Sequence, residues 1–213
     1  MIAIVAGATG LVGEILTRKL LETAEVQRVI IVARKELNLS NPKLSTVLVP
    51  DFKNLAAHSN ELKGTHYFCA LGTTIKTAGS QEKFREVDFD AVLAFGQLAS
   101  QHQATCLSVV SAMGANANSF FFYNRVKGEA EKALQALPLK SLRLYRPGLL
   151  LGSRREHRSG EKAATHVASV LKVVLPNRWF KGLATEASDL AQRMIDDSTS
   201  PSPGLGILSA REI

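Results

Sequence analysis

The hydrophobic residues of the chain gather in short runs rich in β-branched side chains, and segments with helical spacing separate most of these runs. The runs predict buried strands at 2–6, 29–33, 46–49, 66–71, 105–110 and 141–145, with a last candidate at 205–208. Strands that read as continuous apolar runs are buried on both faces, and their alternation with helices is typical of a parallel, doubly wound sheet. The pattern therefore predicts an α/β Rossmann fold with six or seven strands and helices on both faces.

A long amphipathic helix is expected at about 80–101. Its apolar stripe recurs at three- and four-residue spacing through Phe84, Val87, Ala91, Phe95 and Leu98. We interpret this stripe as core packing, with a homodimer face on the same helix as the alternative. Residues 198–206 are rich in Ser, Pro and Gly, and they predict a loop before the last strand.

The first apolar run ends in a glycine-rich turn, Gly7 to Gly13, which opens the next helical pattern. A strand that breaks there and restarts as a helix directs backbone N–H groups and the positive end of a helix dipole at one point, which suits a pyrophosphate. Gly7 accommodates the positive φ of a tight turn, Gly10 lets the phosphates approach, and Gly13 allows close packing of the helix on the strand. Because a second strand follows, the segment reads as a βαβ unit with a dinucleotide site.

The end of the second strand distinguishes between nucleotides. An acidic side chain at this place binds the adenosine ribose of NAD, whereas this chain has Arg34 and Lys35. Their cations suit a 2′-phosphate, so the sequence favours NADP(H) over NAD(H). Asp51 after the third strand could meet the adenine, and Leu71-Gly72 after the fourth could run beside the cofactor. In each case an ordinary strand-end turn or a solvated charge is the alternative.

Two residues on one predicted helix suggest proton transfer. Tyr123 and Lys127 are four residues apart, so they share a helix face. A phenol with a pKa of about 10 is a poor base at neutral pH. An ammonium at roughly 4 Å, with an effective dielectric near 20, favours the phenolate by about 4 kcal/mol, or up to about three pKa units. Ser111, at the end of the fifth strand, could hydrogen-bond the same substrate oxygen; simple packing of the tyrosine on the lysine stem is the alternative.

Composition and charge limit the remaining possibilities. With 213 residues and 46% hydrophobic residues, the chain is expected to form one domain, 1–213. Much of the net charge of +7 lies in the 152–182 segment, which disfavours a general nucleic-acid surface. We expect this segment to act as a small substrate-binding lid that attracts an anionic substrate or the cofactor phosphates, with a solvated loop or a membrane-surface segment as the alternatives.

The cysteines and the apolar segments indicate where the protein works. Cys69 and Cys106 stand alone in predicted strands, so we expect core thiols in a reducing compartment and no metal site. The apolar run before Gly7 is too short for a signal peptide, and no run approaches the roughly 18 residues of a membrane span. The expected protein is cytoplasmic.

Together these motifs resemble the short-chain dehydrogenase/reductase superfamily, in particular its atypical, extended-like members. The resemblance covers nearly the whole chain and rests on GATGLVG at 7–13, Ser111, the YxxxK pair of Tyr123 and Lys127, and Arg146-Pro147-Gly148. Segments 69–74 and 155–160 are similar to the branch related to the HIV Tat-interacting, metastasis-suppressor oxidoreductase.

The resemblance implies roles for individual residues. Ser111 would polarise the substrate oxygen, Tyr123 would act as acid and base, and Lys127 would bind the nicotinamide ribose and lower the Tyr123 pKa. Where many relatives carry an Asn on the long helix, this chain has Asp88, which puts a proton relay through that Asn in doubt. The expected cofactor contacts are Gly7, Thr9, Gly10, Leu11, Val12, Gly13, Arg34, Lys35, Asp51, Leu71, Gly72, Lys127 and Pro147.

The sequence therefore favours an NADP-dependent oxidoreductase that acts on a small carbonyl or alcohol substrate. One alternative is a nucleotide-sensing regulatory protein that acts through partner binding. The other is a cofactor-retaining epimerase or dehydratase of sugar nucleotides, which would share these residues but need more than the small 152–182 region for its substrate.

Overall fold

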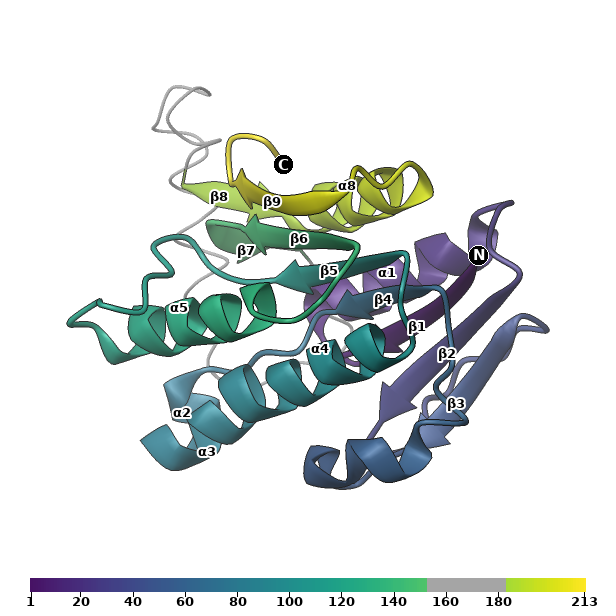
Figure 1. The fold of residues 1–213 in the computed structure, drawn as a ribbon, viewed down its shortest axis with the longest axis horizontal. Coiled ribbons are helices and arrows are strands. Elements are labelled where there is room, and N and C mark those ends of the chain that lie inside the picture. The colour runs from purple at the N-terminus through teal and green to yellow at the C-terminus, as the bar shows by residue number, and fades with distance from the viewer. Residues whose placement is uncertain (153–182) are drawn as a thin grey trace.

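The computed structural model describes residues 1–152 and 183–213. Seven strands form one sheet in the order β3-β2-β1-β4-β5-β6-β9, and every neighbouring pair is parallel (Figure 1). Their bounds are β1 (Ile2–Ala6), β2 (Arg28–Ala33), β3 (Leu44–Leu48), β4 (His66–Cys69), β5 (Cys106–Val110), β6 (Ser141–Arg146) and β9 (Gly204–Ser209). The parallel α/β Rossmann fold expected from the sequence is confirmed.

Helices cover both faces of the sheet (Figure 1). One face carries α1 (Leu11–Glu22) and α8 (Ala187–Thr199), which pack on each other. The opposite face carries α4 (Val92–Gln101) and α5 (Phe122–Gln135), with the 3₁₀ segment η1 (Phe52–His58) at its β3 end. Successive residues of β1 point to opposite faces of the sheet. Ala3 and Val5 pack with α1 and α8, whereas Ile4 and Ala6 belong to the core under α4, α5 and η1.

The predicted helix at 80–101 is a succession of three elements. It begins with α3 (Gln81–Arg85), capped by the Ser80 hydroxyl, passes through the π-helical η2 (Glu86–Ala91), and continues as α4. Phe84, Ala91, Phe95 and Leu98 are buried and Val87 partly so, so the stripe is core, as expected. A homodimer through this helix would have to use its outer side.

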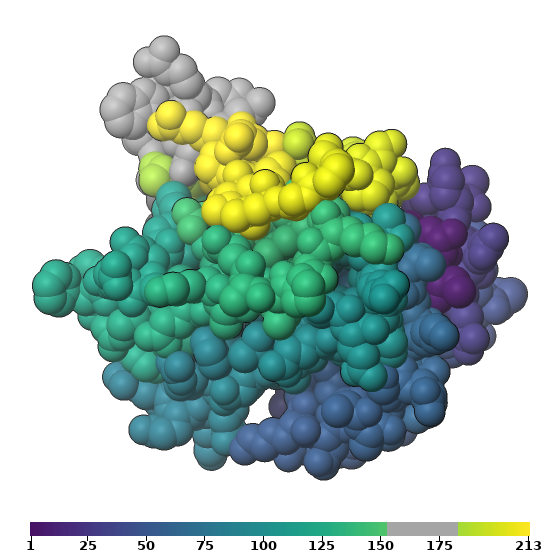
Figure 2. Space-filling model, in the orientation of Figure 1, coloured from purple at the N-terminus to yellow at the C-terminus, as the bar shows by residue number. Residues whose placement is uncertain are grey.

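Three elements near the C-terminus are absent from the sequence prediction. β7 (Leu149–Leu151) and β8 (Ala184–Glu186) form a separate parallel pair, and α8 follows β8. A short α2 (Ile75–Ala78) also precedes α3. Figure 2 shows the C-terminal residues lying along the β6 side of the molecule, where β9 completes the sheet.

The basic segment expected to form a lid, with Arg154, Arg155, His157, Arg158 and Lys162, lies outside the described residues. Within the described ranges, no helix has the length and apolar character needed to cross a membrane, and no His, Cys, Asp or Glu cluster is suited to a metal ion. Cys69 and Cys106 are free and buried, as expected.

Candidate active site

The glycine turn after β1 is packed so closely that side chains would strike backbone atoms. Gly7 has a φ of +87°, and a Cβ there would lie 2.4 Å from the Ala70 carbonyl oxygen. A Cβ on Gly13 would lie 2.1 Å from the Gly7 carbonyl oxygen, because α1 starts directly on the end of β1. The positive φ predicted for Gly7 and the close packing predicted for Gly13 are confirmed.

Gly10 stands in a more open place at the N-cap of α1. Its amide donates to the Gly7 carbonyl at 2.9 Å, and a Cβ on it would lie 3.3 Å from that oxygen. Since glycine has no side chain to accept hydrogen bonds, it leaves the first N–H groups of α1, from Leu11 and Val12 onward, without a cap from this position. Such a helix start is suited to an anion.

The turn lies where the sheet changes its winding direction, because β1 stands between β2 and β4. Doubly wound sheets bind ligands in the crevice beyond the strand ends at this switch point. The contact of Gly7 with Ala70 brings the Leu71-Gly72 segment to the same place. The residues present therefore fit a dinucleotide, with a helix N-terminus for the pyrophosphate and backbone beside it.

The other expected nucleotide contacts lie on the surface. Arg34 and Lys35 are exposed directly after β2, and Thr9 of the glycine turn after β1 is also exposed. Asp51 is also exposed, and its carboxylate accepts from the Lys53 amide at the start of η1. Its position at a strand end is as expected, while its hydrogen bond serves the η1 cap.

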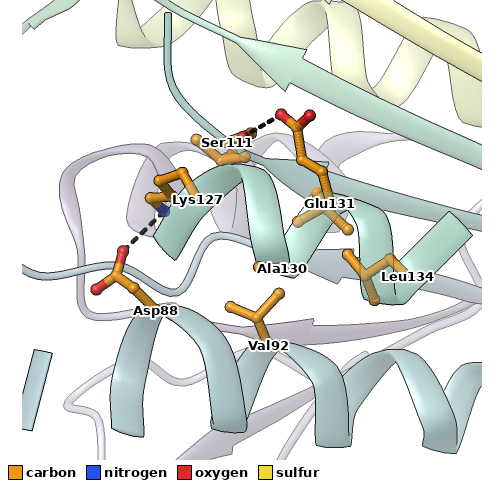
Figure 3. A pocket seen from close by; sticks show the side chains of 9 residues that line it. Asp88, Val92, Ser111, Lys127, Ala130, Glu131 and Leu134 are labelled. Atoms are coloured by element: carbon orange, nitrogen blue, oxygen red, sulfur yellow. Dashed lines mark hydrogen bonds and ion pairs between the residues drawn. The ribbon is translucent and has the colours of Figure 1, made fainter. Parts of the chain in front are cut away.

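Lys127 lies on α5 and points into the protein toward η2 (Figure 3). Its Nζ is 2.8 Å from Asp88 Oδ1, and the side chains are 7% and 0% exposed. The other Asp88 oxygen accepts from the Thr73 amide at 2.9 Å. Burial is the largest single influence and lowers the Lys127 pKa, but the Asp88 and Tyr123 charges, the Asp88 hydrogen bond and the Cys69 thiol together outweigh it and raise the pKa above its ordinary value.

The ion pair lies beneath the path expected for the cofactor. A Cβ on Gly72 would be 3.5 Å from Asp88 Oδ1 and 3.7 Å from Lys127 Nζ. Because Gly72 has no side chain, only its backbone covers the buried pair of Asp88 and Lys127 at the carboxyl end of β4. Asp88 itself lies in the π-helical η2, and such bulges occur frequently at functional sites.

Tyr123 lies in the first turn of α5, one turn before Lys127. It is half-buried, and its ring packs against that of Phe84, with the ring centroids 5.6 Å apart. The phenol interacts electrostatically with Lys127. The structure therefore brings this predicted pair together.

Ser111 belongs to a different set of contacts. Its hydroxyl donates to Glu131 Oε1, and the same carboxylate receives two bonds from Arg146, with Arg146 Nε at 3.0 Å. Ser111 and Lys127 line one small cavity, with room for about one water molecule (Figure 3). The hydroxyl points to Glu131, whereas the sequence prediction directed it to the substrate.

The loop between Ser111 and α5 is fixed against the helix by contacts that the sequence analysis missed. Asn124 Nδ2 donates to the Gly114 carbonyl at 2.7 Å, and the Asn116 amide donates to the Asn124 carbonyl. At Gly128 a Cβ would lie 2.2 Å from the Ala117 amide nitrogen. These contacts hold the loop beside Tyr123 and Lys127.

The carboxyl end of β6 closes the same region. Pro147, expected near the cofactor, is buried, and its carbonyl accepts from the Met113 amide at 2.9 Å. Glu131 raises the Arg146 pKa, mainly through its hydrogen bonds. The spacing of Lys127 and Glu131, four residues apart on the helix face that also carries Ala130 and Leu134, was the signal that could have identified Glu131 as a buried carboxylate.

Comparison with known proteins finds relatives that align over most of the chain. No protein-family model matches the chain. Protein HTATIP2 of Rattus norvegicus is 32% identical over 203 residues, which cover 94% of this chain and 82% of that protein. The mitochondrial protein FMP52 of Candida albicans is 30% identical over 203 residues, covering 92% of this chain and 87% of that protein.

Solved structures share the fold at lower identity. The dTDP-glucose 4,6-dehydratase DesIV of Streptomyces venezuelae, with NAD bound, has a TM-score of 0.74 and 16% identity, covering 97% of this chain and 74% of that chain. MoeE5 in complex with UDP-glucose and NAD has a TM-score of 0.72 and 16% identity, covering 98% of this chain and 75% of that chain.

Proposed function

The chain belongs to the family of HTATIP2 and FMP52 within the short-chain dehydrogenase/reductase superfamily, and on that premise we propose that it is an NADP-dependent oxidoreductase acting on a small carbonyl or alcohol. One observation carries the proposal. Lys127, with Tyr123 one turn away, lies under Gly72 at the carboxyl ends of β1 and β4, where the glycine turn also lies. A proton-transfer pair thus adjoins a dinucleotide cradle.

In the proposed reduction, Tyr123 donates its phenol proton to the carbonyl oxygen while the carbonyl carbon is reduced to that of an alcohol. The reduced nicotinamide, when bound, supplies the hydride. We retain Lys127 as the residue that binds the ribose hydroxyls and orients them beside Tyr123, which requires its buried ammonium to reach past the Gly72 backbone. We retain Ser111 as a group that polarises the substrate oxygen, which requires its hydroxyl to rotate away from Glu131.

The preference for NADP(H) is proposed from Arg34 and Lys35. Both are exposed after β2, at the position where the adenosine ribose lies in dinucleotide folds. A guanidinium can meet a 2′-phosphate with two parallel hydrogen bonds. The solved neighbours bind NAD, so a nicotinamide cofactor has support from the fold, while the choice of NADP rests on these two cations.

A sugar-nucleotide epimerase or dehydratase is the second candidate, because DesIV and MoeE5 share the fold. Such an enzyme keeps its cofactor and gives no net oxidation, which separates it from the first candidate.

We further propose a single domain over 1–213, a cytoplasmic protein and a homodimer through the outer side of 80–101. The mitochondrial FMP52 relatives make the mitochondrion the competing location.

A screen of small aldehydes and ketones, following NADPH absorbance, tests the proposal. The expected result is net NADPH consumption with at least one carbonyl substrate, and slower consumption of NADH. Binding of NADPH without consumption across the panel would favour the regulatory alternative. Conversion of a UDP-sugar with no net change in cofactor would favour the epimerase.

A further inference from the structure

We propose that Asp88 is a positioning residue that holds the Lys127 ammonium beneath Gly72 and cancels much of its charge, so that this carboxylate controls how readily Tyr123 gives up its proton. The inference rests on the proposed function, which gives Tyr123 a proton to transfer. Its basis is a buried ion pair in which Asp88 is fixed from two sides, by Lys127 and by the Thr73 amide.

The charged groups around Lys127 leave Asp88 as its counterion. Among the described residues, the titratable groups that face Lys127 are Asp88 of η2, Tyr123 and Glu131 of α5, and Cys69 of β4. Glu131 is paired with Arg146 through both carboxylate oxygens. Burial raises the pKa of the Cys69 thiol to about 12, so it is neutral at physiological pH. The pair of Asp88 and Lys127 therefore carries opposite charges that offset each other.

This arrangement changes what Tyr123 experiences. A lone ammonium near a phenol would favour the phenolate by up to about three pKa units. A carboxylate 2.8 Å from that ammonium opposes the effect, because phenolate and carboxylate repel each other while both attract the same cation. Removal of the Asp88 charge takes this repulsion away, so Tyr123 releases its proton at lower pH while Lys127 stays protonated; burial then lowers the Lys127 pKa as well, and the two groups titrate as a coupled pair.

The phenolate absorbance of the free protein near 295 nm measures this directly. The chain has three tyrosines. Burial raises the pKa of Tyr67 to about 12 and also raises that of Tyr145, so both ionise late. Subtracting the titration of Tyr123→Phe from that of each protein isolates Tyr123. Asp88→Asn keeps the shape of the side chain and removes its charge, and Asp90→Asn, an exposed residue of the same η2 segment, is the matched control.

The expected result is a phenolate midpoint at least about one pH unit lower in Asp88→Asn than in the wild type, with Asp90→Asn unchanged within about 0.3 unit. Asp88→Glu, which keeps the charge, should stay closer to the wild type. A folded Asp88→Asn protein with the wild-type midpoint would overturn the proposal.

A second variant keeps the test decisive if Asp88→Asn does not fold. The double variant Asp88→Asn with Lys127→Gln removes both charges. If they cancel at Tyr123, its midpoint stays within about 0.5 unit of the wild type, whereas a rise of about one unit or more shows that the lysine charge was not cancelled. These titrations need neither cofactor nor substrate. Their failure would leave the proposed activity standing, and absence of turnover would leave the Asp88 effect standing.

Discussion

Substitution of Gly10 by alanine should separate cofactor binding from folding. The backbone of Gly10 has φ of −84° and ψ of 169°, which alanine adopts without strain. The new Cβ would lie 3.3 Å from the Gly7 carbonyl oxygen and 3.9 Å from that of Ala70, a tight but tolerable fit. The methyl group would, however, occupy the space through which a pyrophosphate approaches α1.

The expected magnitudes follow from these contacts. Loss of glycine at an N-cap and the close contact together cost less than about 1 kcal/mol, or about 2–4 °C in melting temperature for a chain of this size. NADPH affinity should fall about tenfold or more, which corresponds to about 1.4 kcal/mol. Gly13→Ala is the contrasting variant, because its Cβ would lie 2.1 Å from a carbonyl oxygen. It should cost about 3 kcal/mol of folding stability.

Thermal melting and fluorescence titration with NADPH measure the two effects on the same samples. Gly10→Ala should melt near the wild type and bind NADPH poorly, while Gly13→Ala should melt at clearly lower temperature. A Gly10→Ala protein that keeps wild-type NADPH affinity would show that the glycine turn does not hold the pyrophosphate.

Three further predictions concern specificity and stability. Arg34→Ala should weaken NADPH binding about tenfold to a hundredfold and NADH binding much less, since only NADPH carries the 2′-phosphate; equal losses in a fluorescence titration would remove Arg34 from that role. Glu131→Gln should lower the free energy of unfolding by about 2 kcal/mol, because Arg146 loses its charged partner. Glu14→Gln, in the exposed pair with Arg18, should change it by less than about 0.5 kcal/mol. Equal effects of the two variants in urea unfolding would contradict a stabilising role for the pair of Glu131 and Arg146. Burial raises the pKa of Tyr67 and of Cys69 to about 12, so the folded protein keeps protons that the unfolded chain releases. The free energy of unfolding should therefore fall from about pH 8.5 upward, by up to about 1.4 kcal/mol per pH unit for each group. A free energy of unfolding that stays constant between about pH 8 and pH 10.5 would be the contrary result.

Local sequence patterns were sufficient to predict most of the strands and the glycine turn. Each predicted strand matches an observed one within two residues at either end, because a buried parallel strand is a continuous apolar run. The glycine turn was equally readable, since positive φ at Gly7 and close packing at Gly13 are demands on single residues. The spacing of Tyr123 and Lys127 likewise fixed their common helix face.

The polar contacts of the site depend on residues far apart in the sequence. Asp88 meets Lys127, and Ser111 meets Glu131, only after the sheet and two helices have assembled. A carboxylate in an amphipathic pattern is ordinarily assigned to the solvent side. The helical spacing of Glu131 did indicate burial, but only the packed structure shows which groups Asp88 and Glu131 meet. That is why the hydroxyl of Ser111 was directed to the substrate in the sequence prediction.

The missed elements have different causes. β7 and β8 are three residues each, too short for a hydrophobic period to be recognised. In α8, by contrast, Leu190, Ala191, Met194 and Ile195 repeat at helical spacing and are buried, so the signal was present in the sequence.

Transfer of deuterium from NADPH labelled at the reactive C4 position tests net hydride transfer most directly. With a carbonyl substrate found in the screen, the alcohol product of the wild type should gain about one dalton relative to the unlabelled reaction, as hydride transfer requires. Tyr123→Phe should bind NADPH with wild-type affinity and form almost no labelled product, because only the phenol proton is missing. An alcohol product without deuterium, or undiminished labelling by Tyr123→Phe, would contradict the account.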